Sequence, residues 1–195
     1  EGNTSVRTLP NGTQIKGRYM LVSAESLTPS HNPLDNWNTS EGFPLNERGQ
    51  NINDRDYKND VSAQNETIRI AQQYGGQAVE QVPTVSPEGV VYDGNGRTMA
   101  GIIAAQNGTD ASYIETLKAN ASNFGFTPQQ VNEIPSARVV FVTDEVLPYT
   151  TQTFAQFNQQ EKKTQSSTEN AVAKSKSLDA QTISQLLSVV GSTVI

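Results

Sequence analysis

A single segment near the middle of the chain constrains the fold most, because in it a β-hairpin runs directly into a helix. Two apolar runs, residues 82–85 and 90–92, flank Ser86-Pro87-Glu88-Gly89, which puts proline second and glycine fourth in a four-residue turn. Apolar residues then recur at helical spacing as far as Asn107-Gly108, a typical end of a helix. The strand-to-helix junction between them is Gly94-Asn95-Gly96-Arg97. The chain must therefore combine strands with helices.

The junction, residues 94–97, has the composition of an anion-binding site. Its two glycines allow the backbone to approach a ligand closely, and the first amides of a helix have no acceptor within the helix. Arg97 adds a planar, charged donor that suits phosphate. The alternative is an ordinary tight turn whose arginine pairs with a carboxylate on the surface. These four residues alone leave both interpretations open.

The composition limits the classes of protein to which the chain can belong. Its 195 residues suffice for one medium-sized domain with its own core. The absence of cysteine excludes disulfides and thiol chemistry, and the single histidine, His31, argues against a structural zinc site. The net charge of −6 argues against sequence-independent binding of nucleic acid, because counterion release requires clustered Lys and Arg. Any contact with DNA is expected to be local or made by another domain.

No stretch of about 18 apolar residues occurs in the sequence, and the N-terminus lacks an apolar signal core. We therefore expect a soluble protein with no membrane partner. The first residue is Glu1 rather than methionine, which predicts either a fragment cut from a longer polypeptide or a processed chain.

The N-terminal part is expected to alternate between extended and helical structure. Residues 1–16 are predicted to form an arm, and the apolar residues 19–22 a buried strand. A long polar passage follows over residues 23–60, and passages of this length often carry function. Residues 62–74 then predict a helix that ends at two glycines. Its packed side is expected to consist of Ile68, Ala71 and Tyr74.

The C-terminal half carries two further helix starts and the clearest strand signal. Ser112-Tyr113-Ile114-Glu115 and Thr127-Pro128-Gln129-Gln130 both have the pattern of a capping box. Residues 137–143 have a β-branched and aromatic centre, and they predict a strand in the middle of a sheet. From Tyr149 onward the pattern becomes helical.

This order of elements predicts an α+β fold, in which helices pack against a small mixed sheet and a helical extension follows. We expect an N-terminal arm at residues 1–16, a core domain at residues 17–148 and a helical C-terminal extension at residues 149–195. The apolar stripe at residues 178–190 is expected to serve the core or a dimer contact.

Ordered short motifs along residues 17–178 give the chain a family resemblance. They are Gly17-Arg18-Tyr19 with Leu21-Val22, Ser30-His31-Asn32-Pro33, Arg55-Asp56, Pro87-Glu88-Gly89-Val90-Val91, the junction, and Ser166-Ser167-Thr168-Glu169-Asn170-Ala171. With these motifs the chain resembles the ParB/sulfiredoxin superfamily, most closely the DdrB-like ParB domains of phage and mobile-element polyproteins. The resemblance implies a ParB-like core whose partners are a second copy or other polyprotein domains, in the host cytoplasm or in the virion.

The resemblance also implies a cofactor. In that superfamily the tetrapeptide at the junction binds nucleotide phosphates, those of CTP in ParB and of ATP in sulfiredoxin. It therefore implies that CTP or ATP, with Mg²⁺, lies on the residues of the junction and also contacts Arg55 and Asn158. These junction residues are Gly94, Asn95, Gly96 and Arg97. The catalytic cysteine of sulfiredoxin is missing here, which excludes sulfinic-acid reduction.

The chain departs from the ParB pattern at two places that concern nucleotide hydrolysis. Asn53-Asp54-Arg55 stands where ParB has Gln-Pro-Arg, so only the arginine is kept. Phe157-Asn158 stands where ParB has a Glu-Asn pair that helps to hold phosphate and magnesium. Magnesium prefers carboxylates, phosphates and water to a lone amide. Binding of nucleotide is therefore better supported than its hydrolysis.

Three functions are compatible with the sequence. The first is a nucleotide-binding module, an NTPase if it turns its ligand over, in DNA transactions of a phage or mobile element. The second is a metal-dependent DNA nuclease, with Asp54, Asp56 and Asp93 as metal ligands, Asn158 as a further candidate ligand and His31 assisting catalysis. The third is a non-enzymatic scaffold that binds partner proteins.

Each candidate residue also has a purely structural interpretation. His31 would be a loop histidine hydrogen-bonded to backbone, and residues 54–56 a solvated turn. Asn158 would be an amide on a helix surface. Trp37, the only tryptophan, is expected to pack its loop onto the core rather than to stack on a base.

Overall fold

The computed structural model describes residues 1–157. The chain divides into two compact units, Glu1–Ala155 and Gln156–Ile195, and the description below concerns the first. Asn158, the motif at residues 166–171 and the apolar stripe at residues 178–190 lie outside the described residues. The expected helical extension is represented only by its first part, since residues 151–157 are helical.

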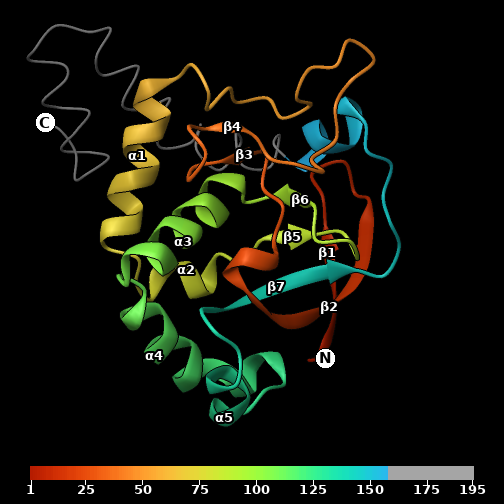
Figure 1. Ribbon diagram of the computed structural model, residues 1–195. Coiled ribbons are helices and arrows are strands. Elements are labelled where there is room, and N and C mark those ends of the chain that lie inside the picture. Colours follow the sequence, from red (N-terminus) through yellow and green to blue (C-terminus); the bar gives the residue numbers. More distant parts are fainter. Residues whose placement is uncertain (158–195) are drawn as a thin grey trace, which may run out of the picture. The chain divides into compact units, whose positions relative to one another are not determined.

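A five-stranded mixed sheet forms the frame of the domain (Figure 1). Its strands, in spatial order, are β1 (Thr4–Thr8), β2 (Gln14–Ser23), β7 (Ala137–Thr143), β5 (Thr84–Val85) and β6 (Val91–Asp93). Strand β7 is antiparallel to β2 and parallel to β5, and the other neighbours are antiparallel. The predictions of a mixed sheet and of a central strand at residues 137–143 are confirmed.

The N-terminal arm expected at residues 1–16 is part of the sheet. Strand β1 pairs with β2 from Thr4 opposite Arg18 to Thr8 opposite Gln14, and it forms one edge. The backbone amide of Gly2 also donates a hydrogen bond of 2.8 Å to the carbonyl of Tyr19. These residues therefore belong structurally to the core domain.

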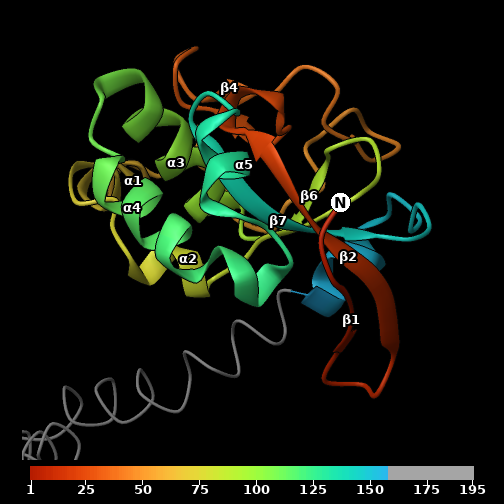
Figure 2. The same cartoon turned by 90° about the horizontal axis from the view of Figure 1, so that it is seen from below.

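Besides the helical residues 151–157, five α-helices accompany the sheet in the described part of the chain. They are α1 (Val61–Gln72), α2 (Gln77–Glu80), α3 (Asn95–Asn107), α4 (Ala111–Asn120) and α5 (Pro128–Asn132). Two 3₁₀ turns, η1 (Ala24–Ser26) and η2 (Ala121–Phe124), complete them. Figures 1 and 2 show α1, α3 and α4 gathered on one side of β7, with the β1–β2 hairpin on the other. The domain is thus an α+β fold, as predicted.

The helix ends show where local patterns decide structure and where they do not. The capping box at residues 127–130 is confirmed, with both reciprocal hydrogen bonds present. The one at residues 112–115 is wrong, because α4 begins at Ala111 and its N-cap is Asp110, two residues before Ser112. Ile68 was expected on the packed side of α1 but is 37% exposed. The buried side of α1 consists of Ala63, Thr67 and Ala71.

The core lies between the helices and the sheet. Leu27, Val85, Val91 and Val140 form one buried cluster on the sheet side. Helix α3 is buried along most of its length, and its buried residues include small ones that allow close packing. Because β6 leads into α3 across this core, the junction is held at the end of the hairpin.

The polar passage at residues 23–60 is an ordered layer built from short elements. Strands β3 (His31–Asn32) and β4 (Asn38–Thr39) pair with each other, and η1 precedes them.

No helix within residues 1–157 is long and apolar enough to span a bilayer.

Candidate functional site

The predicted hairpin-to-helix junction is confirmed, and Gly94 is its turning point. Strand β6 ends at Asp93 and α3 begins at Asn95. Gly94 occupies the N-cap position with φ +90°, in the left-handed region that strongly favours glycine. No side chain of the described residues caps this helix start. The first amides of α3 are therefore the donors that the helix itself cannot satisfy.

The side chain of Asn95 joins the junction to a loop that is distant in the sequence. Its Oδ1 accepts a hydrogen bond of 2.6 Å from the backbone amide of Ser30. Its Nδ2 donates to the carbonyl of Val91 at 3.3 Å and to Oδ1 of Asn53 at 3.4 Å. Asn95 is only 7% exposed. Of this predicted ligand, the backbone amide rather than the side chain is suited to contact a phosphate.

Three asparagines and a serine fix the loop at residues 51–57 beside the junction. Asn51 donates to the carbonyl of Ser30 at 2.8 Å and to the hydroxyl of Thr39 at 3.2 Å. The backbone amide of Asn53 donates to Oδ1 of Asn51 at 2.9 Å. Side-chain amides can satisfy buried backbone groups where no ladder is available. This network explains why an irregular loop holds one conformation.

Tyr57 brings a phenol to the start of α3. A Cβ added to Gly96 would lie 2.9 Å from Oη of Tyr57, so the hydroxyl lies next to this glycine. The ring of Tyr57 stacks on Trp37 with centroids 6.3 Å apart, and it lies 5.5 Å from the imidazole of His31. Trp37 is buried and packs its loop, in agreement with the favoured interpretation. The sequence did not indicate Tyr57 as a site residue.

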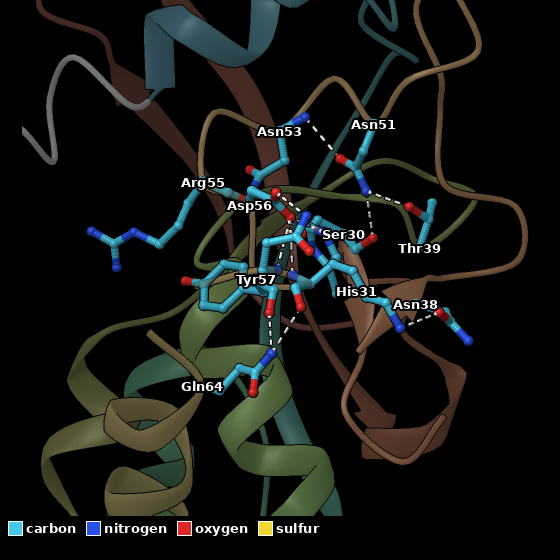
Figure 3. A network of polar contacts seen from close by, with 12 residues as sticks. Ser30, His31, Asn38, Thr39, Asn51, Asn53, Arg55, Asp56, Tyr57 and Gln64 are labelled. Carbon is cyan, nitrogen blue, oxygen red and sulfur yellow. Dashed lines mark hydrogen bonds and ion pairs between the residues drawn. The ribbon is translucent and has the colours of Figure 1, made fainter. Parts of the chain in front are cut away.

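The two predicted arginine ligands differ in how firmly they are held. Nε of Arg97 donates to the carbonyl of Gln81 at 3.0 Å, and Nη2 lies 3.9 Å from Oδ2 of Asp93. Arg55 is exposed, with its guanidinium 5.9 Å from the ring of Tyr57, and Figure 3 shows it extending away from the polar network. Arg97 is thus preorganised, whereas Arg55 can move toward a ligand.

A second arginine, Arg7, lies at the junction, and the sequence did not indicate it as a site residue. It donates to the carbonyl of Val82 at 3.0 Å and to the hydroxyl of Thr84 at 2.5 Å, and its guanidinium lies over Phe141. Burial raises the pKa of Asp93, while Arg97 and Arg7 oppose that rise. The three groups together carry one excess positive charge. No local motif marks Arg7, because its partners are 75 or more positions away.

His31 is buried in the same network rather than held by backbone alone. Its Nδ1 lies 2.9 Å from Oγ of Ser30, and Nε2 lies 4.0 Å from Oδ1 of Asp56. Burial lowers the pKa of His31, and the Asp56 carboxylate partly opposes this. With an exposed fraction of 3%, His31 is placed to support the loop rather than to touch a ligand.

The comparison with protein families can be made on this geometry. The family model of the ddrB-like ParB superfamily domain matches residues 10–147, more than half of the chain. The chain belongs to the ddrB-like ParB superfamily. No curated protein and no solved structure matches it.

The match includes three of the segments that meet at the start of α3 in this ddrB-like ParB domain, whereas Arg7 precedes the matched residues. Residues 30–31, residues 53–57 and the junction are far apart in sequence and adjacent in space. Asn158 lies outside the described residues, so its place relative to this site stays a prediction.

The candidate metal ligands do not gather into a metal centre. Within residues 1–157, no group of three His, Asp or Glu side chains could hold an ion. Both oxygens of Asp56 are engaged, since Oδ1 accepts from the amides of Lys58 and Asn59 and Oδ2 accepts from the Asn59 side chain. Asp54 is exposed, and Asp93 faces two arginines. This donor set does not fit a magnesium site made by the described part of the ddrB-like ParB domain.

His31, the only histidine, provides a direct test of the polar network. We expect its NMR titration midpoint below 6.5, because burial disfavours the imidazolium. The unfolded chain then takes up the proton at higher pH than the folded chain. The free energy of unfolding should therefore fall as pH drops below about 6.5 and level off below the folded-state pKa.

Two variants isolate this effect from the titration of carboxylates. His31→Gln should lose the component of the pH dependence between neutral and mildly acidic pH, measured by urea unfolding. Asp56→Asn should lower the His31 pKa further, because the carboxylate raises it. A His31 midpoint above 6.5 would contradict the buried, neutral imidazole.

Proposed function

We propose that this ddrB-like ParB domain binds a nucleoside triphosphate, CTP or ATP, through its phosphates at the start of α3. The amides of Asn95, Gly96 and Arg97 donate to the phosphate oxygens, and the Arg97 guanidinium supplies charge. The observation that carries the proposal is a helix start with a left-handed glycine and no side-chain cap, placed beside a fixed arginine.

The electrostatics of the junction favour an anion there. The dipole of a 13-residue helix places partial positive charge at its N-terminus. Arg7, Asp93 and Arg97 add one net positive charge in partly buried surroundings, where charges are screened less than in water. The whole chain is acidic, with a net charge of −6, so this positive charge is local. Local charge suits a small anionic ligand better than a long DNA backbone.

The proposed role is binding, in DNA transactions of a phage or mobile element in which other domains or a second copy contact DNA. Because the described carboxylates do not fit a magnesium centre, any Mg²⁺ would have to be held mainly by phosphate and water. The nuclease alternative needs carboxylates that converge, and the described ones do not. No step of hydrolysis is therefore assigned.

A thermal-shift panel tests the proposal. CTP, ATP, GTP and ADP, each with and without Mg²⁺, are added to the wild-type chain. A ligand at 100 times its Kd should raise Tm by roughly 5–10 °C, since ligand that binds only the native state stabilises it by mass action. No shift with any nucleotide at millimolar concentration would refute the proposal.

Arg97→Ala identifies the site of that shift. Loss of a charge-assisted hydrogen bond should weaken binding by roughly 10- to 100-fold and reduce the shift to about one half to one sixth of the wild-type value. The matched control is Arg69→Ala, since Arg69 is exposed on α1 and, among residues 1–157, pairs with the neighbouring Glu66. Equal nucleotide shifts in the two variants would place the ligand elsewhere.

A further inference from the structure

A small cavity is lined by residues of α3 and β7, among them Thr98 of α3 and Val139 of β7. It has about 10 Å³ of room for the centre of a water molecule. Three of the lining residues, Tyr74, Thr98 and Arg138, have polar side chains, and the other lining residues include Leu27 and Val139. A volume of this size holds one water and nothing larger.

Two buried polar atoms on this wall lack partners. Oγ1 of Thr98 and Nε of Arg138 have no hydrogen-bond partner among residues 1–157. Each residue is only 4% exposed. A buried polar group without a partner destabilises the native state by about 1–3 kcal/mol, so two on one cavity wall call for a bound molecule.

The third polar group, the hydroxyl of Tyr74, lies close to Nε of Arg138. A Cβ added to Gly101 would lie 3.0 Å from Nε of Arg138 and 3.0 Å from Oη of Tyr74. Both atoms therefore lie next to Gly101 of α3, and both belong to residues that line the cavity. An ordered internal water usually needs two to four polar partners, and this cavity offers three.

The charge balance decides between a neutral molecule and an anion. The guanidinium of Arg138 is already paired with Asp110, through a hydrogen bond of 2.8 Å to Oδ2. The same side chain also donates to the carbonyls of Gly101 and Ala137. Because Asp110 already neutralises the guanidinium, an anion in the cavity would gain no net attraction. Its transfer out of water would still be unfavourable.

We propose that this cavity binds one structural water that bridges α3 to β7. Its oxygen accepts a hydrogen bond from Nε–H of Arg138, and one of its hydrogens is donated to Oγ1 of Thr98. Its remaining capacity is directed to the hydroxyl of Tyr74. Because Thr98 directly follows Arg97, this water fixes the first turn of α3 on the side opposite the junction.

Crystal structures of the wild type and of Thr98→Val test the site. Valine keeps the shape of threonine and removes the hydroxyl. We expect a density peak within hydrogen-bond distance of Arg138 Nε and Thr98 Oγ1 in the wild type. In Thr98→Val, Tm should fall by roughly 3–6 °C. Thr98→Ser, which keeps the hydroxyl, should retain the peak and lose less in Tm than Thr98→Val.

Three results would overturn the proposal. One is a cavity with no density peak in a well-resolved wild-type map. Another is an anomalous peak in the cavity after a bromide soak, which would assign it to an anion. The third is a Thr98→Val variant that matches or exceeds the wild type in Tm, which would mean that the hydroxyl has no partner to lose.

Discussion

Replacing Asp110 with alanine should lower the free energy of unfolding by about 3–5 kcal/mol. Asp110 is the carboxylate partner of Arg138, at 2.8 Å, and the two side chains are 15% and 4% exposed. The guanidinium also lies over the rings of Tyr74 and Tyr113, about 5 Å from each centroid. Removing the carboxylate leaves a buried, uncompensated charge, which costs more than the pair itself contributes. Urea unfolding measures the loss.

A matched control lies on the same helix. Glu115 pairs with Lys118 at 3.0 Å but is 72% exposed, and exposed pairs contribute at most about 1 kcal/mol. Glu115→Ala should therefore change stability little. The double variant Asp110→Ala with Arg138→Met should regain part of the loss, since it also removes the stranded charge. Equal losses in Asp110→Ala and Glu115→Ala would contradict the buried pair.

Gly94→Ala should both destabilise the domain and abolish nucleotide binding. Alanine at φ +90° is strained, and its Cβ would lie 3.0 Å from Nη2 of Arg97 and 3.3 Å from the backbone Cα of Pro83. The arginine tip can move, whereas Pro83 cannot. Strain and crowding together should cost about 2–4 kcal/mol. Displacement of Arg97 should remove the nucleotide-dependent rise in Tm.

Gly108 at the other end of α3 is the control for backbone strain alone. It also has positive φ, +68°, but no atom of the described residues lies within 4 Å of an added Cβ. Gly108→Ala should cost about 1 kcal/mol and leave the nucleotide shift intact. If both variants lose the shift equally, general destabilisation rather than the junction would be responsible.

The sequence predicts the fold best where the determinants are local. The turn at residues 86–89, the capping box at residues 127–130 and the strand at residues 137–143 depend on neighbours in the chain, and all three are confirmed. The prediction that Ile68 is packed is wrong, because tertiary contacts determine which face of α1 is buried. The prediction of an N-cap at Ser112 is wrong, because Asp110 occupies the N-cap position of α4.

Of the candidate site, the sequence predicts the junction but not its surroundings. The clamp from Asn95 to Ser30 joins residues 65 positions apart, and Arg7 reaches residues even more distant. Such contacts arise from the topology of the sheet, which no window of neighbouring residues encodes. The length of the polar passage at residues 23–60 predicts a functional segment, but the asparagine network that orders it is visible only in three dimensions.

Backbone amide chemical shifts under titration with CTP and ATP test the central claim most directly. The amides of Asn95, Gly96 and Arg97 should shift most, with saturation at millimolar nucleotide or below, and Arg97→Ala should weaken the effect. A separate groove of about 500 Å³ lies between residues 45–52 and 149–152. Chemical-shift changes confined to the amides that line that groove, or no changes at all, would contradict a phosphate site at the start of α3.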